Sequence, residues 1–329
     1  MIRRLLVAAV VLGLAGLGVF YLLTTPSVVD ASALPQHTAD LKNGEAMFNA
    51  GGCASCHTTP ASDKCDDPKH DPKPMLGGGR CLKTPFGTFN VPNISQDKGN
   101  GIGGWTDAQF VTAMVKGVSP EGSHYYPAFP FASYQRMKVE DVLDLWAYLK
   151  TVPAVATPSK PHDLALPFKL RRGIGMWKLL FLDGQSFTPD AKQTAEWNRG
   201  AYLVNGPGHC AECHSGRNAA GAIDEARRWS GGADPEGRGW IPNITPHADG
   251  LAEWSDKDIA YMLESGFTPA YDAVGSTMAD VVKNTARLTA EDRDAMATYL
   301  KSLPAKPGKS PRAKKAAEKD APPAGDGKK

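Results

Sequence analysis

The sequence carries no excess of charge of either sign. Lysine and arginine number 37 against 35 aspartate and glutamate residues in a chain of 329, which gives a formal net charge of +2 at pH 7. That balance gives no argument for nucleic acid as a partner, and any charged docking surface must be local. Paired carboxylates, a Ser-His or Cys-His nucleophile and a phosphate-binding loop are also not recognisable. The sequence therefore offers no support for these kinds of catalysis.

Cysteine is scarce, with six residues, but four of them fall in one repeated pattern. Residues 53–57 read CASCH and residues 210–214 read CAECH. Positions i, i+3 and i+4 of a helical turn share one face, so two thiols and one imidazole point the same way. This arrangement attaches haem c covalently, because the cysteines add to the haem vinyl groups and the histidine binds the iron. The predicted attachment residues are Cys53, Cys56, Cys210 and Cys213, and the predicted proximal iron ligands are His57 and His214.

Zinc and a redox-active dithiol are the alternatives for a CxxC pattern. A structural zinc site needs four ligands, which usually come from two paired half-sites. Here the two motifs are 157 residues apart, and each is followed by its own predicted helices. The added histidine and the repetition favour two haem c groups.

The two remaining cysteines, Cys65 and Cys81, are sixteen residues apart. In an exported protein such a pair is most simply a disulfide that closes a local loop. Two free thiols are the next alternative, and a thiolate haem ligand is a third.

Residues 5–23 contain no charged side chain and follow Arg3 and Arg4. This apolar run is longer than that of a usual cleaved signal and about long enough to span a bilayer. The two arginines would stay in the cytoplasm, which sends the rest of the chain outward. We predict a membrane anchor or signal over 1–24 and a tether over 25–38, on the periplasmic side of the bacterial inner membrane. Cleavage after residues 31–33, which would release a soluble periplasmic protein, is the alternative.

The two halves of the chain repeat further motifs in the same order. Residues 91–95 read VPNIS and residues 241–245 read IPNIT, while YLKTVP at 148–153 returns as YLKSLP at 299–304. Apolar residues at helical spacing accompany these motifs. We predict an all-α fold with two tandem domains over 39–153 and 197–304.

The segments outside these domains differ in composition. The predicted connector 154–196 contains a basic and apolar run at 169–182, for which packing between the domains is favoured over contact with a membrane or a partner. The segment 305–329 has no apolar period and is predicted to be a disordered tail.

The second axial ligand of each iron is a separate prediction. A methionine raises the reduction potential, and an open position admits small ligands. Met278 follows one predicted helix and precedes the final one, in a loop from which its thioether could reach across the haem. In the first domain Met137 is the leading candidate, and His124 and Met75 remain open as alternatives.

The chain resembles the membrane-anchored dihaem cytochromes c with two class I cytochrome c domains, which are related to the cytochrome c subunits of periplasmic alcohol and gluconate dehydrogenases. The resemblance covers about residues 39–304. It rests on both CxxCH motifs, VPNI at 91–94, YPAFP at 126–130 and WNRGAYL at 197–203. Such relatives often carry methionine where this chain has Phe129, and the dehydrogenase subunits commonly have three haems rather than two.

The resemblance implies helices wrapped around each haem and the transfer of single electrons. The implied donor is a quinol or a dehydrogenase, the implied acceptor is a terminal oxidase, and the N-terminal helix would hold the protein in the inner membrane. This predicts an electron-transfer protein or a subunit of an oxidoreductase complex rather than an independent enzyme. A dihaem redox enzyme of the peroxidase or thiosulfate-oxidising type, with an open or unusually ligated first haem, is the alternative.

Overall fold

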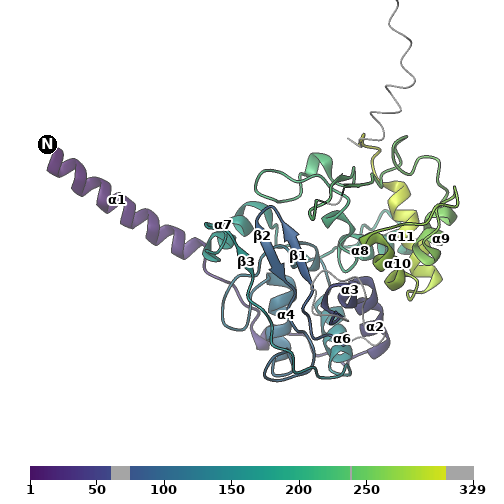
Figure 1. Ribbon diagram of the computed structural model, residues 1–329, viewed down its shortest axis with the longest axis horizontal. Coiled ribbons are helices and arrows are strands. Elements are labelled where there is room, and N and C mark those ends of the chain that lie inside the picture. Colours follow the sequence, from purple (N-terminus) through teal and green to yellow (C-terminus); the bar gives the residue numbers. More distant parts are fainter. Residues whose placement is uncertain (61–74, 238, 309–329) are drawn as a thin grey trace, which may run out of the picture.

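The computed structural model of the chain describes residues 1–60, 75–237 and 239–308. Its longest helix, α1 (Ile2–Leu23), projects away from the rest of the molecule (Figure 1). None of its residues is buried, and an 18-residue stretch within it has a mean hydropathy of 2.5. At 1.5 Å per residue the helix is about 33 Å long. By length and composition it can cross a membrane.

Two helical domains follow, with their elements in the same order. Each has a first helix, a short CxxCH segment, a middle helix, a shorter helix and a last helix. In the first domain these are α2 (Leu41–Ala50), α3 (Cys53–His57), α4 (Asp107–Lys116), α5 (Phe131–Tyr134) and α6 (Val139–Leu149). In the second domain they are α8 (Ala195–Asn205), the 3-10 turn η2 (Cys210–Glu212), α9 (Asp256–Ser265), α10 (Thr277–Thr285) and α11 (Ala290–Ser302).

Local sequence explains where the middle helices begin. Thr106 caps α4 and exchanges hydrogen bonds with Gln109, and Ser255 does the same for α9 with Asp258. Each pair satisfies backbone N–H groups that the first helical turn leaves without partners. The middle helix of each domain is therefore started by the same capping box.

Glycine allows the first and last helices of each domain to cross closely. A methyl group at Gly44 in α2 would overlap the carbonyl oxygen of Asp144 in α6. A methyl group at Gly200 in α8 would overlap the carbonyl oxygen of Ala295 in α11. The glycine that both halves share therefore has a packing role.

Most buried apolar side chains of both domains belong to one hydrophobic cluster, and Phe89, Tyr126 and Leu164 form a second, smaller one. In the first domain Trp146 stacks on Phe110, with ring centroids 4.6 Å apart, and Met47 and Phe48 of α2 are buried with them. The same cluster includes Ile259 from the second domain. The two domains therefore share a continuous core.

The predicted all-α class is correct in that the described fold is mostly helical, but it omits two small sheets. Strands β1 (Cys81–Thr84), β2 (Gly87–Asn90) and β3 (Asp163–Leu164) form one antiparallel sheet, in which Leu82 pairs with Phe89. Strands β4 (Gly232–Ala233) and β5 (Trp240–Ile241) form the other. Strands of two to four residues are too short to show a recognisable alternation of apolar and polar residues in the sequence.

Two segments outside the domains are better attached than their composition indicates. In the predicted tether, the backbone N–H of Val29 donates to Thr112 at 2.9 Å, and His37 lies 2.6 Å from Asp144. Beyond the last helix, the N–H of Gly308 donates to Asp249 at 2.7 Å. The predicted tether is therefore held against the first domain at these points, and Gly308 of the predicted tail lies against the second domain.

The connector contains one more helix, α7 (Arg172–Phe181), which contacts both domains. The ring of Trp177 packs edge-on against Phe131 of the first domain, and its N–H donates to the carbonyl of Ala220 in the second domain. The predicted packing of this run between the domains is thus observed for the face of α7 that carries Trp177.

Candidate haem sites

The two predicted iron ligands have the same environment. In each, the ring Nδ1 lies 2.8 Å from a proline carbonyl oxygen: Pro92 for His57 and Pro242 for His214. A carbonyl oxygen only accepts, so Nδ1 carries the proton and donates it. The lone pair of Nε2 is then available to a metal, which is how protein scaffolds commonly orient a ligating histidine.

Burial supports the neutral form of both rings. Desolvation lowers the pKa of His57 to about 4 and also lowers the pKa of His214. Burial likewise raises the pKa of the Cys53 and Cys210 thiols to about 12, so these cysteines are not pre-ionised in the polypeptide. The environment of the motif therefore suits metal binding by histidine and does not suit a reactive thiolate.

The asparagine that follows each of these prolines holds the chain beyond the last helix. Asn93 donates to the carbonyl of Val155 at 2.6 Å, and Asn243 donates to the carbonyl of Lys306 at 2.7 Å. The repeated Pro-Asn pair therefore positions the proximal histidine and closes the domain. The repeat is visible in the sequence but this role is not, because it depends on contacts between residues 62 and 63 positions apart along the chain.

The two axial methionine candidates do not occupy equivalent positions. Met278 is half-buried in the first turn of α10, which is a helix and not the loop we predicted. Met137 is almost fully buried, follows α5 and lies against Gly206 of the second domain. It directly precedes the residue that caps the last helix, as the buried Leu288 does in the second domain.

The alternative ligand His124 is engaged elsewhere. Its Nε2 lies 2.9 Å from the carbonyl oxygen of Thr24, and its Nδ1 lies 3.1 Å from the ammonium of Lys178. Both ring nitrogens therefore have partners at the base of α1. Met75, the other alternative, is half-buried, and its carbonyl accepts from Thr59, two residues after the proximal histidine.

The Cytochrome c family profile matches this chain twice, over residues 41–153 and 198–304. The chain belongs to the cytochrome c family. It is 48% identical over 303 residues to the "Diheme cytochrome c-type" protein of Cereibacter sphaeroides, which covers 92% of this chain and 99% of that protein. This cytochrome carries two covalently bound haem c groups, as both CxxCH motifs predict.

More distant relatives are parts of dehydrogenases. The cytochrome is 35% identical to the fructose dehydrogenase cytochrome subunit of Gluconobacter japonicus, over 90% of this chain and 58% of the relative. It is 34% identical to the gluconate 2-dehydrogenase cytochrome c subunit of Pantoea cypripedii, over 81% of this chain and 60% of the relative. The chain thus spans about three fifths of these subunits. Its similarity to them agrees with the predicted relation to dehydrogenase cytochrome c subunits.

A reciprocal pair of hydrogen bonds joins each haem-attachment segment of this cytochrome to a helix of the other domain. Asn284 of α10 donates to the hydroxyl of Ser55 in the first CxxCH at 2.7 Å. Ser133 of α5 donates to the carboxylate of Glu212 in the second CxxCH at 2.9 Å. Ser55 and Glu212 occupy the same place in the motif, and Ser133 and Asn284 each lie five residues before the cap of the last helix. We call these four residues the interdomain clasp.

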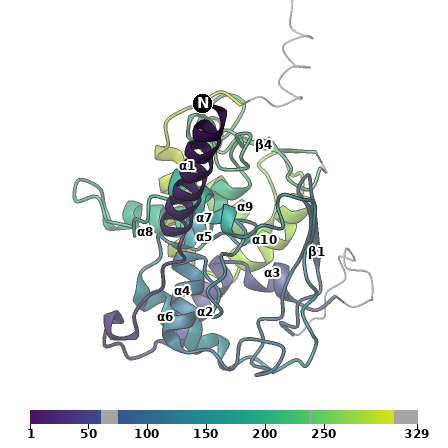
Figure 2. The same ribbon diagram turned by 90° about the vertical axis from the view of Figure 1, so that its left-hand side faces the viewer.

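Electrostatic effects between the domains follow the same reciprocal pattern. Burial raises the pKa of Tyr148 and of Tyr299, and each effect is opposed by an arginine of the other domain, Arg287 and Arg136 respectively. The thiols of Cys56 and Cys213 are also close enough to interact electrostatically. The two domains therefore face each other through their haem-attachment segments, as the adjacent positions of α3 and α10 illustrate (Figures 1 and 2).

His209, next to the second motif, also contributes to this interface. Its Nε2 lies 3.2 Å from the carbonyl oxygen of Gly51, and its ring meets Tyr134 edge-on at 5.7 Å. Burial lowers the pKa of His209, so a neutral ring donates to that carbonyl. The histidine is a structural group between the domains.

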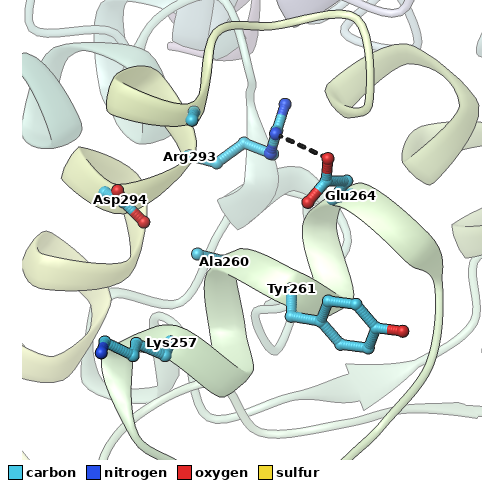
Figure 3. Close-up of a pocket in the computed structure, with 7 residues that line it drawn as sticks. Lys257, Ala260, Tyr261, Glu264, Arg293 and Asp294 are labelled. Carbon is cyan, nitrogen blue, oxygen red and sulfur yellow. Dashed lines mark ion pairs between the residues drawn. The ribbon is translucent and has the colours of Figure 1, made fainter.

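Other candidate sites are limited. A surface pocket between α9 and α11 is lined by charged residues, two of which, Arg293 and Glu264, pair at 3.1 Å (Figure 3). It contains none of the predicted haem residues. In the described ranges no group of three or more histidine, cysteine or acidic side chains is placed to hold a further metal ion.

Cys65 lies outside the described residues, so its disulfide with Cys81 remains a prediction.

Proposed function

We propose that this dihaem cytochrome carries single electrons on the periplasmic side of the bacterial inner membrane. The donor is a dehydrogenase or a quinol-oxidising complex, and the acceptor chain ends in a terminal oxidase. Each haem iron supplies the one-electron couple. The observation that carries the proposal is the interdomain clasp, because it fixes each haem-attachment segment to the other domain. The dehydrogenase subunits among the relatives support a dehydrogenase as donor.

The polypeptide's part in this function is to hold the ligands still. The Pro92 and Pro242 carbonyls fix the orientation and tautomer of the two proximal histidines. A ligand that keeps its position in both oxidation states keeps the reorganisation energy of electron transfer small. The shared core limits relative motion of the two domains.

For the distal positions we propose Met278 at the second haem and Met137 at the first. Met278 is supported by its half-buried place in α10, and Met137 by the engagement of both ring nitrogens of His124. Replacing either methionine by alanine should remove about half of the methionine-to-iron charge-transfer absorption of the oxidised protein. His124→Ala is the control and should leave that absorption unchanged. An unchanged spectrum in Met137→Ala would refute the assignment at the first haem.

We also propose that α1 is retained as a membrane anchor. Thr24 at its end is almost completely buried, and its carbonyl and hydroxyl oxygens accept from His124 and Arg172. Cleavage after residue 33 would remove these partners from the buried His124 and the half-buried Arg172. Intact-mass measurement of the purified protein tests the proposal, since a mature chain starting near residue 34 would refute it.

Electron transfer is tested with the purified full-length holoprotein. Haem absorbance should report reduction by a quinol analogue, or by a sugar or alcohol dehydrogenase with its substrate. Membranes that contain a terminal oxidase should then reoxidise the protein in a cyanide-sensitive reaction. Failure of both donors would refute the carrier role. Turnover of peroxide or thiosulfate by the protein alone would instead favour the dihaem enzyme with an open first haem.

A further inference from the structure

Exposed apolar side chains gather around α7. In the described part of the chain outside α1, the largest sequence-local group of exposed large apolar residues lies at 166–181, with exposed fractions between 38% and 74%. We call this group the α7 surface; it consists of Leu166, Phe168, Leu170, Leu179, Leu180 and Phe181. Isolated exposed apolar residues need no explanation, but a clustered set marks an interaction site.

The end of α1 is built into the same region. Arg172 donates to the hydroxyl of Thr24 at 2.9 Å, to Thr25 at 3.1 Å and to the backbone carbonyl of Tyr21, and its guanidinium lies over the Tyr21 ring. Thr24 also packs directly on Gly175, where even a methyl group would clash. The views in Figures 1 and 2 both place α7 at the base of α1. The anchor and α7 therefore meet in a fixed contact.

This contact sets the depth of α7 relative to a bilayer. If α1 spans the membrane, residues 21–25 lie at its outer boundary, and Tyr21 is a residue type typical of that boundary. Arg172 and Leu179 are seven residues apart in α7 and share a face, so Leu179 lies on the side that contacts the end of the anchor. Lys178 and Trp177 hold α7 against the body: Lys178 donates to the carbonyls of Lys116 and Gly117, and the Trp177 ring packs on Phe131.

The charge of the segment fits a lipid surface. Residues 166–182 contain four basic side chains and no acidic one; Lys169 is exposed, and the other three also contact protein groups. An apolar face flanked by basic residues is the pattern of helices that lie in the headgroup region of membranes with anionic lipids. A protein partner would not require this surface to adjoin the anchor.

We propose that the α7 surface rests on the outer leaflet of a bilayer with anionic headgroups, beside the anchor. This contact goes beyond a simple tether, because it holds the first haem domain in one orientation at the membrane. It rests on the proposed retention of α1. The consequence is that the domain cannot rotate freely about the end of its anchor.

The test compares the accessibility of two introduced thiols in full-length holoprotein reconstituted in vesicles of phosphatidylglycerol and phosphatidylcholine. Leu180→Cys lies in the α7 surface, and Tyr261→Cys, on α9, is the control. The parent side chains are 67% and 55% exposed, so the protein alone predicts similar reaction with a membrane-impermeant maleimide. We expect the thiol at position 180 to react at least about fivefold more slowly than the thiol at 261. The unmodified sequence gives the background from native cysteines.

The outcomes separate the proposed lipid contact of the α7 surface from the proposed retention of α1 as an anchor. Equal labelling in chains that stay with the vesicles after an alkaline carbonate wash would overturn the lipid contact alone. Release of the chains by that wash would overturn the anchor and the lipid contact with it. Protection in native membranes but not in pure lipid vesicles would assign the surface to a protein partner and also overturn the proposal.

Discussion

The interdomain clasp allows a quantitative prediction, because its two hydrogen bonds are equivalent in position but differ in charge. Ser133 donates to a carboxylate oxygen of Glu212, whose side chain is 12% exposed and also binds Arg217 at 2.7 Å. Asn284 donates to the neutral hydroxyl of Ser55. A hydrogen bond to a charged group contributes about 1.5–3 kcal/mol, against about 0.5–1.5 kcal/mol for a neutral one.

The assay is a double-mutant cycle at each pair, from denaturant unfolding of the holoprotein. Ser133→Ala and Glu212→Ala should be coupled by about 2 kcal/mol, and Ser55→Ala and Asn284→Ala by about 1 kcal/mol. The loss of the Arg217 partner is common to the single and double variants at Glu212 and cancels in the cycle. Coupling at the charged pair no larger than the additivity error of about 0.3 kcal/mol would refute the reasoning.

Two variants of the charged pair, Glu212→Gln and Ser133→Ala, separate the effect of charge at the second haem from that of packing. Glu212→Gln removes a negative charge between the two attachment cysteines, which disfavours the ferric state and should raise the reduction potential of that haem. Ser133→Ala breaks the same contact without changing charge and should leave the potential close to its original value. Potentiometric titration of both variants distinguishes the effects. A fall in potential for Glu212→Gln would contradict the electrostatic argument.

Two further predictions concern the helix crossings. Gly200→Ala should lower the free energy of unfolding by about 2–4 kcal/mol, because the methyl group would overlap a carbonyl oxygen of α11. Thermal denaturation measures the effect. The control is Gly173→Ala in α7, where a methyl group would meet no other atom, so this variant should not destabilise the protein. Burial alone would raise the pKa of Asp144, but hydrogen bonds from groups including Asn43 and His37 hold that pKa below its usual value. The ionised form therefore stabilises the fold fully above about pH 4, and this contribution is lost as the pH falls through the lowered pKa. Asp144→Asn should cost about 2 kcal/mol at neutral pH and progressively less in acid, and a pH-independent difference would show that the charge is not responsible.

The sequence by itself determined the cofactor and the duplication. Haem attachment needs two cysteines and one histidine within five residues, so local spacing is sufficient to recognise it. The capped middle helices and the apolar stripes of the last helices are local too, and the all-α class followed from them. The repeated Pro-Asn pair showed that the two halves are copies, although its hydrogen bonds were not visible in the chain.

Only the tertiary structure decided which groups meet across the molecule. The clasp joins Ser55 to Asn284 over 229 residues, and the anchor contact joins Thr24 to Arg172 over 148. Serine, asparagine, threonine and arginine are common surface residues, and no periodicity marks them as partners. Their pairing follows from how the two domains and α7 pack, and packing depends on the shapes of all the buried faces together. The sequence therefore shows that there are two haems, and the tertiary structure shows that each attachment segment lies against the other domain and that α7 packs on the end of α1.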